Sequence, residues 1–236
     1  SAQVYDALMT HPKFRTNFGW CPKEELAVST RIFTKKYTER IVRAAFEHAV
    51  KYSYKSVTVC EKPNVIRETS GMMEAEAAEA AKHFPDIQLW STNIDAQMMW
   101  LTKNPEDYGV IVAGNMFGDI VSDGFAGLVG GLGFACSANI GKDVAVFEPT
   151  HGSAPKYETL NPSIVNPIAM ILSACMMLDH LGEEEKAGRI RSAVAAVIAE
   201  GTVRTYDMLK MPGGADVIEK GSATTQQLTD AIVAHL

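Results

Sequence analysis

The sequence has 236 residues, of which 47% are hydrophobic, and its 28 acidic and 22 basic side chains give a net charge of −6. Such a composition suits a globular chain with one large core or two smaller ones. A mildly acidic chain without a block of Lys or Arg lacks the basic face that nucleic acid or an anionic membrane requires. We therefore expect neither of them among its partners.

The cysteines indicate a reducing compartment. They are far apart, with no C-x-x-C pair and no histidine at zinc spacing. We expect reduced and mostly buried thiols, and a location in the cytoplasm, with the mitochondrial matrix as the alternative. The four are Cys21, Cys60, Cys136 and Cys175.

Residues 1–36 have no regular pattern except for an alternating run, LAVSTRIF at 26–33, which predicts a strand. From residue 37 on, helical and strand patterns alternate with short connections. This alternation predicts an α/β layer fold in which at least part of the sheet is parallel. The predicted elements are helix 37–52, strand 55–61, helix 68–84, strand 86–91, helix 94–104, strand 108–114 and helix 115–128.

The rest of the chain begins with a glycine-rich passage at 127–141, followed by a strand that runs into a loop within 143–155, and is then mainly helical. The most apolar helix candidate, 164–181, is interrupted by polar residues, so we expect a core helix and no membrane span. Without a repeat or a low-complexity linker, any domain boundary lies near Gly130.

The helix predicted at 115–128 carries two carboxylates at a helical spacing. Asn115, Asp119 and Asp123 share one stripe. A like-charge pair at this spacing costs an isolated helix roughly 0.2 to 0.5 kcal/mol. Either Asp119 complements the positive start of the helix and Asp123 is simply solvated, or the two form part of a site for a divalent cation. The apolar residues that can face the core are Ile120, Val121, Phe125 and Leu128.

Two further polar residues follow predicted strands. Asp95 is a candidate for a third metal ligand. Lys62 stands before a turn that Pro63 and Asn64 fix. A lysine there is usually a solvated cation, but one that lies in a crevice beside a metal can have a pKa low enough for proton transfer.

The loop after the strand in 143–155 contains His151, Gly152, Lys156 and Tyr157. The glycines of GLVGGLG do not have the G-x-G-x-x-G spacing of a dinucleotide fingerprint. From these residues alone, the loop is a plausible contact for an anion or a nucleotide.

Together the motifs resemble the metal-dependent decarboxylating β-hydroxyacid dehydrogenases, the family of the isocitrate, isopropylmalate, homoisocitrate and tartrate dehydrogenases. The resemblance spans nearly the whole chain. It implies the layered α/β fold of that family, with a small dimerisation domain and the C-terminal part of the large domain. The motifs are EKPNV, IDAQMM, GNMFGDIVSD, EPTHGSAPKY and NPIAMILSACMMLDHLG.

The resemblance also implies roles for single residues. Asp119 and Asp123 would bind Mg²⁺ or Mn²⁺ in one subunit, and Asp95 of the neighbouring subunit would complete the site. Lys62, also from the neighbour, would accept the proton of the substrate hydroxyl. Tyr5 lies where the family has the tyrosine that protonates the enolate.

For the cofactor, the resemblance favours NADP over NAD. The family's NAD enzymes typically carry an acidic residue after HGSAP, whereas this chain has a lysine and a tyrosine, as the NADP-dependent isocitrate dehydrogenases do. A cation there suits a ribose phosphate. The implied cofactor residues are His151, Gly152, Lys156, Tyr157, Asn166, Tyr206 and Lys210.

The implied activity is the oxidative decarboxylation of isocitrate, a 2-hydroxy acid. The alternatives are NAD-dependent oxidation of isopropylmalate, homoisocitrate or tartrate, and, in another class, a non-catalytic regulatory subunit. The family's chain normally starts well before this one and carries its substrate-recognition segment there. We expect a truncated, split or degenerate chain, with truncation favoured, and no turnover by these residues alone.

The resemblance implies a homodimer with shared active sites. Residues 1–36 would form a clasp between subunits, in which Phe18 and Trp20 are buried. Residues 37–129 would form the small domain with the metal and catalytic residues, and 130–236 the C-terminal part of the cofactor-binding domain.

Overall fold

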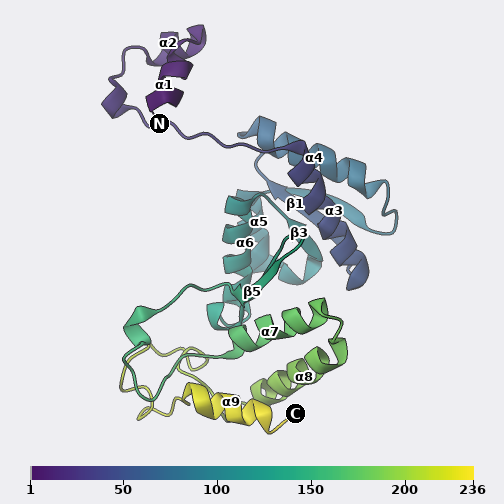
Figure 1. Ribbon diagram of the computed structural model, residues 1–236, viewed down its shortest axis with the longest axis vertical. Coiled ribbons are helices and arrows are strands. Elements are labelled where there is room, and N and C mark those ends of the chain that lie inside the picture. The colour runs from purple at the N-terminus through teal and green to yellow at the C-terminus, as the bar shows by residue number, and fades with distance from the viewer. Residues whose placement is uncertain (1) are drawn as a thin grey trace. The chain divides into compact units, whose positions relative to one another are not determined.

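The structure is a computed structural model that describes residues 2–236 (Figure 1). The chain forms two compact units, and neither is a continuous segment. The first contains the chain up to Asn93 together with Tyr108–Gly114, and the second contains Ile94–Asp107 and Asn115–Leu236. This division differs from the predicted segments, because residues 94–107 and 115–129 of the predicted small domain belong to the second unit.

The first unit is built on a three-stranded parallel sheet with the strand order β2-β1-β3. This confirms the predicted α/β class and the parallel pairing. All six residues of β1 are buried, as expected for a central strand covered on both faces. The strands are β1 (Ser56–Glu61), β2 (Gln88–Asn93) and β3 (Val110–Val112).

Two helices, α3 (Lys35–Lys51) and α4 (Arg67–Ala81), pack against each other and against the sheet. The rings of Phe46 and Phe84 stack there with centroids 5.2 Å apart. The buried residues of this core are Val42, Ala45, Phe46, Ala49, Val57, Val59, Met73, Ala77 and Val112.

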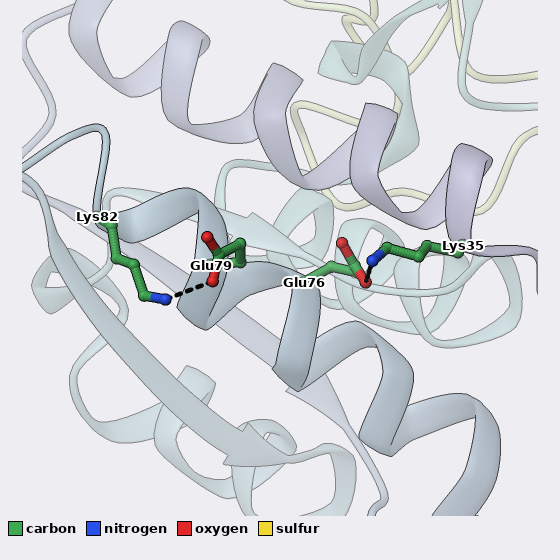
Figure 2. Close-up of polar contacts among 4 residues, drawn as sticks. All are labelled: Lys35, Glu76, Glu79 and Lys82. Carbon is green, nitrogen blue, oxygen red and sulfur yellow. Dashed lines mark hydrogen bonds and ion pairs between the residues drawn. The ribbon is translucent and has the colours of Figure 1, made fainter.

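Two ion pairs lie on the outside of these helices (Figure 2). Lys35 reaches Glu76 across the two helices with an N–O distance of 3.6 Å, and Glu79 pairs with Lys82. The exposed lysines of both pairs are well solvated, so each pair contributes about 0 to 1 kcal/mol. The apolar core, and not these pairs, holds α3 and α4 together.

The N-terminal segment differs from its prediction in two ways. It forms the short helices α1 (Ala2–Met9) and α2 (Pro12–Phe18) and the 3-10 turn η1 (Lys23–Glu25), where irregular structure was expected. The strand predicted at 26–33 is wrong, since these residues belong to no strand or helix. Alternation alone does not make a strand, because the backbone also needs a paired neighbour.

The second unit contains an antiparallel hairpin and five helices among the described residues. The sequence did not predict β4, which lies in the glycine-rich passage. The hairpin pairs β4 (Cys136–Ile140) with β5 (Ala145–Pro149). The helices are α5 (Ile94–Lys103), α6 (Asn115–Leu128), α7 (Ile168–His180), α8 (Glu184–Glu200) and α9 (Thr225–Val233), with 3-10 turns η2 (Pro105–Asp107), η3 (Leu132–Phe134) and η4 (Pro155–Tyr157).

Helices α7, α8 and α9 pack in sequence order around a second apolar core. Arg191 on α8 pairs with Asp179 on α7. None of the helices in residues 2–236 is both long and apolar enough to cross a membrane. The buried residues of this core are Ile168, Ala193, Val194, Val197, Leu228 and Ile232.

The cysteines are all free thiols, as their spacing predicted. Burial together with the nearby Glu61 carboxylate raises the pKa of Cys60 to about 12. Cys60 and Cys175 are buried, and Cys21 and Cys136 are half-buried.

Candidate functional site

Lys62 is the first residue after β1, and hydrogen bonds fix its main chain on both sides. Its N–H donates to Oγ of Ser70 at 3.3 Å. Its carbonyl accepts from the N–H groups of Val65 at 3.1 Å and Ile66 at 2.8 Å. The predicted turn is therefore present, and it leads directly into α4.

Glu61, the last residue of β1, is a buried carboxylate that the sequence analysis did not single out. It is 1% exposed. Its Oε1 accepts the N–H of Gly114 at 2.6 Å, and its Oε2 accepts the hydroxyl of Ser70 at 2.8 Å. A carboxylate is normally solvated, so the signal available in the sequence was an acidic residue closing an otherwise apolar strand.

The candidate metal ligands all belong to the second unit. Asp95 lies in the first turn of α5, and Asp119 and Asp123 lie one turn apart on α6. All three are exposed. Within the described part of this one chain, no group of three His, Cys, Asp or Glu side chains is placed to hold a metal ion.

The packing of α6 corrects part of its predicted core face. Val121 is buried and Phe125 is half-buried, but Ile120 and Leu128 are exposed. The helix packs on α5 through Gly124, where an added Cβ would lie 2.8 Å from the side chains of Met98 and Leu101. Gly124 lies four residues from both Ile120 and Leu128, so the close contact with α5 is made within the predicted apolar face, at its glycine.

The two predicted catalytic residues are in the first unit. Lys62 follows β1, and Tyr5 lies on α1, where the ammonium group of Lys23 is 5.1 Å from its ring centroid. The structure thus places Lys62 and Tyr5 in one compact unit and the three aspartates in the other.

A cavity of about 750 Å³ lies within the second unit. This is the size of a pocket for a drug-sized or cofactor-sized molecule. Its wall includes the Gly130–Gly133 turn, in which Gly130 and Gly131 have φ angles of 117° and 103° that favour glycine. The glycine-rich passage therefore forms part of a cavity wall, although it lacks the G-x-G-x-x-G spacing of a dinucleotide fingerprint.

Five of the seven predicted cofactor residues line this cavity, and two do not. Lys156 lies outside its wall, with its ammonium group 4.7 Å from the ring centroid of Tyr157. Lys210 is exposed, with a φ angle of 57°. The five lining residues are His151, Gly152, Tyr157, Asn166 and Tyr206.

Tyr157 and Tyr206 form a hydrogen-bonded pair in the wall. Their ring centroids are 5.6 Å apart. Hydrogen bonds to Tyr206 and then to Lys156 lower the pKa of Tyr157 below its ordinary value. Burial, followed by the hydrogen bond to Tyr157, raises the pKa of Tyr206. Tyr157 therefore lies in contact with Tyr206 and next to the cation of Lys156.

Asp207 is a wall residue that the sequence analysis did not select, although it directly follows Tyr206. Its Oδ2 accepts from Nδ2 of Asn166 at 2.9 Å, and its Oδ1 accepts from the hydroxyl of Thr205 at 2.6 Å. Oδ1 of Asn166 in turn accepts the N–H of Ile168 at 3.0 Å at the start of α7. A Cβ at Gly133 would lie 2.6 Å from Asp207, so this wall requires a glycine there.

Comparison with known proteins identifies the family. The isocitrate/isopropylmalate dehydrogenase family matches residues 6–232, and the chain belongs to this family. The 3-isopropylmalate dehydrogenase of Archaeoglobus fulgidus is 47% identical over 188 residues, which are 80% of this chain and 56% of the relative. The isocitrate/homoisocitrate dehydrogenase of Thermus thermophilus is 43% identical over 212 residues, which are 90% of this chain and 59% of the relative.

A solved structure gives the same result for the fold. The crystal structure of isocitrate dehydrogenase from Methylococcus capsulatus superposes with a TM-score of 0.80 at 41% identity, covering 90% of this chain and 60% of that chain. This confirms the predicted family fold. The chain spans about half the length of the curated relatives it matches. The family is one of dehydrogenases, which typically use a nicotinamide cofactor and a divalent metal.

Proposed function

We propose that the whole protein oxidises isocitrate and decarboxylates it to 2-oxoglutarate, with NADP and Mg²⁺ or Mn²⁺. The observation that carries this proposal is the Lys156–Tyr157–Tyr206 cluster at the wall of the 750 Å³ cavity. Two tyrosine hydroxyls beside an ammonium group suit a phosphate better than a bare ribose hydroxyl. Lys210, an exposed lysine four residues after Tyr206, would supply a second cation for the phosphate.

The aspartates of α6 suit a hard cation. Asp119 and Asp123 are exposed, one turn apart, and present only oxygen ligands, which Mg²⁺ and Mn²⁺ prefer. Asp95 of a second subunit would add the third carboxylate. When bound, the cation would act as a Lewis acid toward the substrate oxygens.

Lys62 would act as the general base for the substrate hydroxyl, and Tyr5 as the acid that returns a proton after carbon dioxide has left. The fixed main chain of Lys62 supports the first role, because a base must be held within hydrogen-bond reach of the proton it removes. NADP would accept the hydride. His151 and Gly152 would contact it from the loop after β5.

A second candidate is an NAD-dependent enzyme for isopropylmalate or homoisocitrate, the substrates named for two of the relatives. One observation favours it. The cavity wall contains the carboxylates of Glu158 and Asp207, whereas Lys156 and Lys210 lie outside it. Carboxylates are the usual partners of the ribose hydroxyls of NAD.

We propose a homodimer because α5 and α6 expose a large apolar surface. Scattered apolar residues are normal, but five large ones on two packed helices and a sixth directly after α6 are typical of an interface. The exposed fraction reaches 67% at Val129. A partner subunit would also cover Trp20, which is 77% exposed in the single chain. The six residues are Met99, Trp100, Met116, Ile120, Leu128 and Val129.

The test of the activity is a panel of 2-hydroxy acids assayed with NADP and with NAD on the whole protein. We expect isocitrate with NADP to have the highest kcat/KM. Faster turnover of isopropylmalate or homoisocitrate with NAD would select the second candidate. Because the chain spans about half of its relatives, we expect these 236 residues by themselves to give no turnover.

The test of the metal site is a Mn²⁺ titration of the whole protein and of Asp119→Asn. We expect the variant to bind Mn²⁺ at least about tenfold more weakly, since a lost charged ligand contributes more than 1.4 kcal/mol. Asp143→Asn, in the exposed turn between β4 and β5, is the matched control. Equal affinity in all three proteins would remove Asp119 from the metal site and favour a regulatory subunit.

A further inference from the structure

The buried carboxylate of Glu61 connects three parts of the first unit. Through Oε1 it holds the N–H of Gly114 at 2.6 Å, and through Oε2 it holds the hydroxyl of Ser70 at 2.8 Å. The same hydroxyl accepts the N–H of Lys62 at 3.3 Å. One side chain therefore links the main chain at Lys62 to helix α4 and to Gly114.

Each end of this link is adjacent to a residue of the proposed reaction. Lys62 is the proposed base, and Gly114 directly precedes Asn115, where α6 with Asp119 and Asp123 begins. The residue at 114 is fitted to the carboxylate, because a Cβ there would lie 2.9 Å from Oε1 of Glu61 and 2.8 Å from the ring of Phe33. The glycine thus leaves the room that the short hydrogen bond needs.

Because the link is buried, it requires a carboxylate or its amide analogue at position 61. Glu61 is 1% exposed and Ser70 is 0% exposed, so water does not replace either partner. A buried ionised group is tolerated when its oxygens are hydrogen-bonded, and here both oxygens are. An apolar residue at position 61 would fill the strand end but leave the N–H of Gly114 and the hydroxyl of Ser70 without this acceptor.

We propose that Glu61 is a positioning residue that fixes Lys62 and the start of α6 with a single carboxylate. The proposal rests on the proposed function, in which Lys62 serves the active site of the partner subunit while α6 serves its own. Glu61 then connects the two active sites of the dimer. Its loss in one subunit would impair both sites, whereas loss of Lys62 in one subunit would impair one.

The first experiment compares Glu61→Ala, Glu61→Gln and Ser70→Ala in the whole protein. For Glu61→Ala we expect kcat to fall about 10- to 100-fold with KM for the hydroxy acid unchanged, since small misplacements of reacting groups have effects of this size. Glu61→Gln keeps an acceptor for Gly114 and a hydrogen bond to Ser70, so it should restore kcat to within about threefold. Ser70→Ala breaks only the link to Lys62 and should lower kcat without weakening Mn²⁺ binding.

The matched control is Glu68→Gln, an exposed acidic residue in the first turn of α4, which should leave kcat unchanged. If Glu61→Gln loses as much activity as Glu61→Ala, the negative charge and not the position matters, and the proposal fails. It also fails if Glu61→Ala keeps the kcat of the unmodified enzyme.

The second experiment uses heterodimers, purified through two different tags, in which one subunit is unmodified. A heterodimer with Lys62→Ala in the other subunit should keep about half of the activity, because one of two sites retains its base. A heterodimer with Glu61→Ala should fall well below half. Half activity or more in the second heterodimer would overturn the connection between the sites.

Amide hydrogen exchange separates failure of this proposal from failure of the proposed function. In Glu61→Ala, the amides of Lys62 and Gly114 should exchange faster, while the amides of α8 stay protected. If the unmodified protein turns over no hydroxy acid but these two amides still respond together, the proposed function fails and the link through Glu61 stands. If the two amides keep their protection, the link fails.

Discussion

The side chains of Tyr157 and Tyr206 are hydrogen-bonded to each other in the wall of the cavity, with ring centroids 5.6 Å apart. Tyr157 comes from the turn after β5, and Tyr206 from the segment between α8 and α9. This contact joins two stretches that are about fifty residues apart in the sequence. Two separate parts of the chain therefore form one wall of the cavity together.

Replacement of Tyr206 by Phe should raise the pKa of Tyr157. The hydrogen bond from Tyr206 is the largest cause that lowers this pKa, and the variant removes it while keeping the ring. The measurement is an alkaline titration of phenolate absorbance. The signal of Tyr157 is the difference between the single variant Tyr206→Phe and the double variant that also carries Tyr157→Phe. Tyr54→Phe, in the first unit, is the control and should leave this titration unchanged. A pKa of Tyr157 that stays depressed in the variant would assign the shift to Lys156.

Gly213→Ala should weaken nucleotide binding. An added Cβ would lie 2.3 Å from Oη of Tyr157, so the ring must move and lose Tyr206. Because an aromatic contact contributes about 0.5 to 1.5 kcal/mol, we expect Kd for NADP to rise roughly three- to tenfold.

Calorimetric titration measures this change, and Gly188→Ala on α8 is the control, since no atom lies within 4 Å of its Cβ position. Nucleotide affinity that is equal in both variants would show that Tyr157 does not contact the cofactor.

Thr224→Ala should destabilise the second unit. The Thr224 hydroxyl accepts the N–H of Gln227 at 3.1 Å, and Oε1 of Gln227 accepts the N–H of Thr224 at 2.8 Å. These two bonds form a capping box at the start of α9. Loss of such a cap lowers the free energy of unfolding by about 1 kcal/mol. Urea unfolding measures this change, with the exposed Thr202→Ala as the control that should stay within error.

Stability should depend on pH through His235. Hydrogen bonds to the carbonyl of Ala231 and then to the carboxylate of Glu200 raise the pKa of His235 above its ordinary value. The folded state therefore favours the charged ring. The resulting stabilisation is complete below the unfolded pKa of about 6.5 and is lost as the pH rises through the higher folded pKa.

The measurement is Tm as a function of pH for the unmodified protein and for His235→Gln. The difference between them should be largest in mildly acidic solution and should shrink toward alkaline pH. A difference that grows with pH would mean that the folded state favours the neutral ring.

Elements with a strong period were predicted well, and those that depend on distant partners were not. Helix α3, helix α6 and the three parallel strands lie within a few residues of their predicted positions, because burial repeats along each element. The run at 26–33 alternates in the same way, yet it has no paired neighbour in the described chain. Pairing is a property of two segments, and one segment does not encode it.

The site shows the same limit. The motifs located Tyr157 and Tyr206, which line the cavity together. A motif does not say which way a flexible lysine points, and Lys156 lies over the ring of Tyr157 without lining the cavity itself. Glu61 and Asp207 were missed because each acts through hydrogen bonds to distant residues that only folding brings into place. The role of Glu61 in the reaction, like the role of Asp119 in metal binding, is a prediction for the experiments above.

The interleaving of the two units along the chain constrains how the protein is made. The chain leaves the first unit after Asn93 and returns for Tyr108–Gly114, so β3 is synthesised after α5, a helix of the second unit. Until Val112 has left the ribosome, β1 can pair with β2 on one side only, and the edge that β3 will occupy stays open. An open edge of an apolar strand invites pairing with other chains. A pause in translation that leaves β1 and β2 outside the ribosome and β3 still inside should therefore promote aggregation, whereas a pause after β3 has emerged should not.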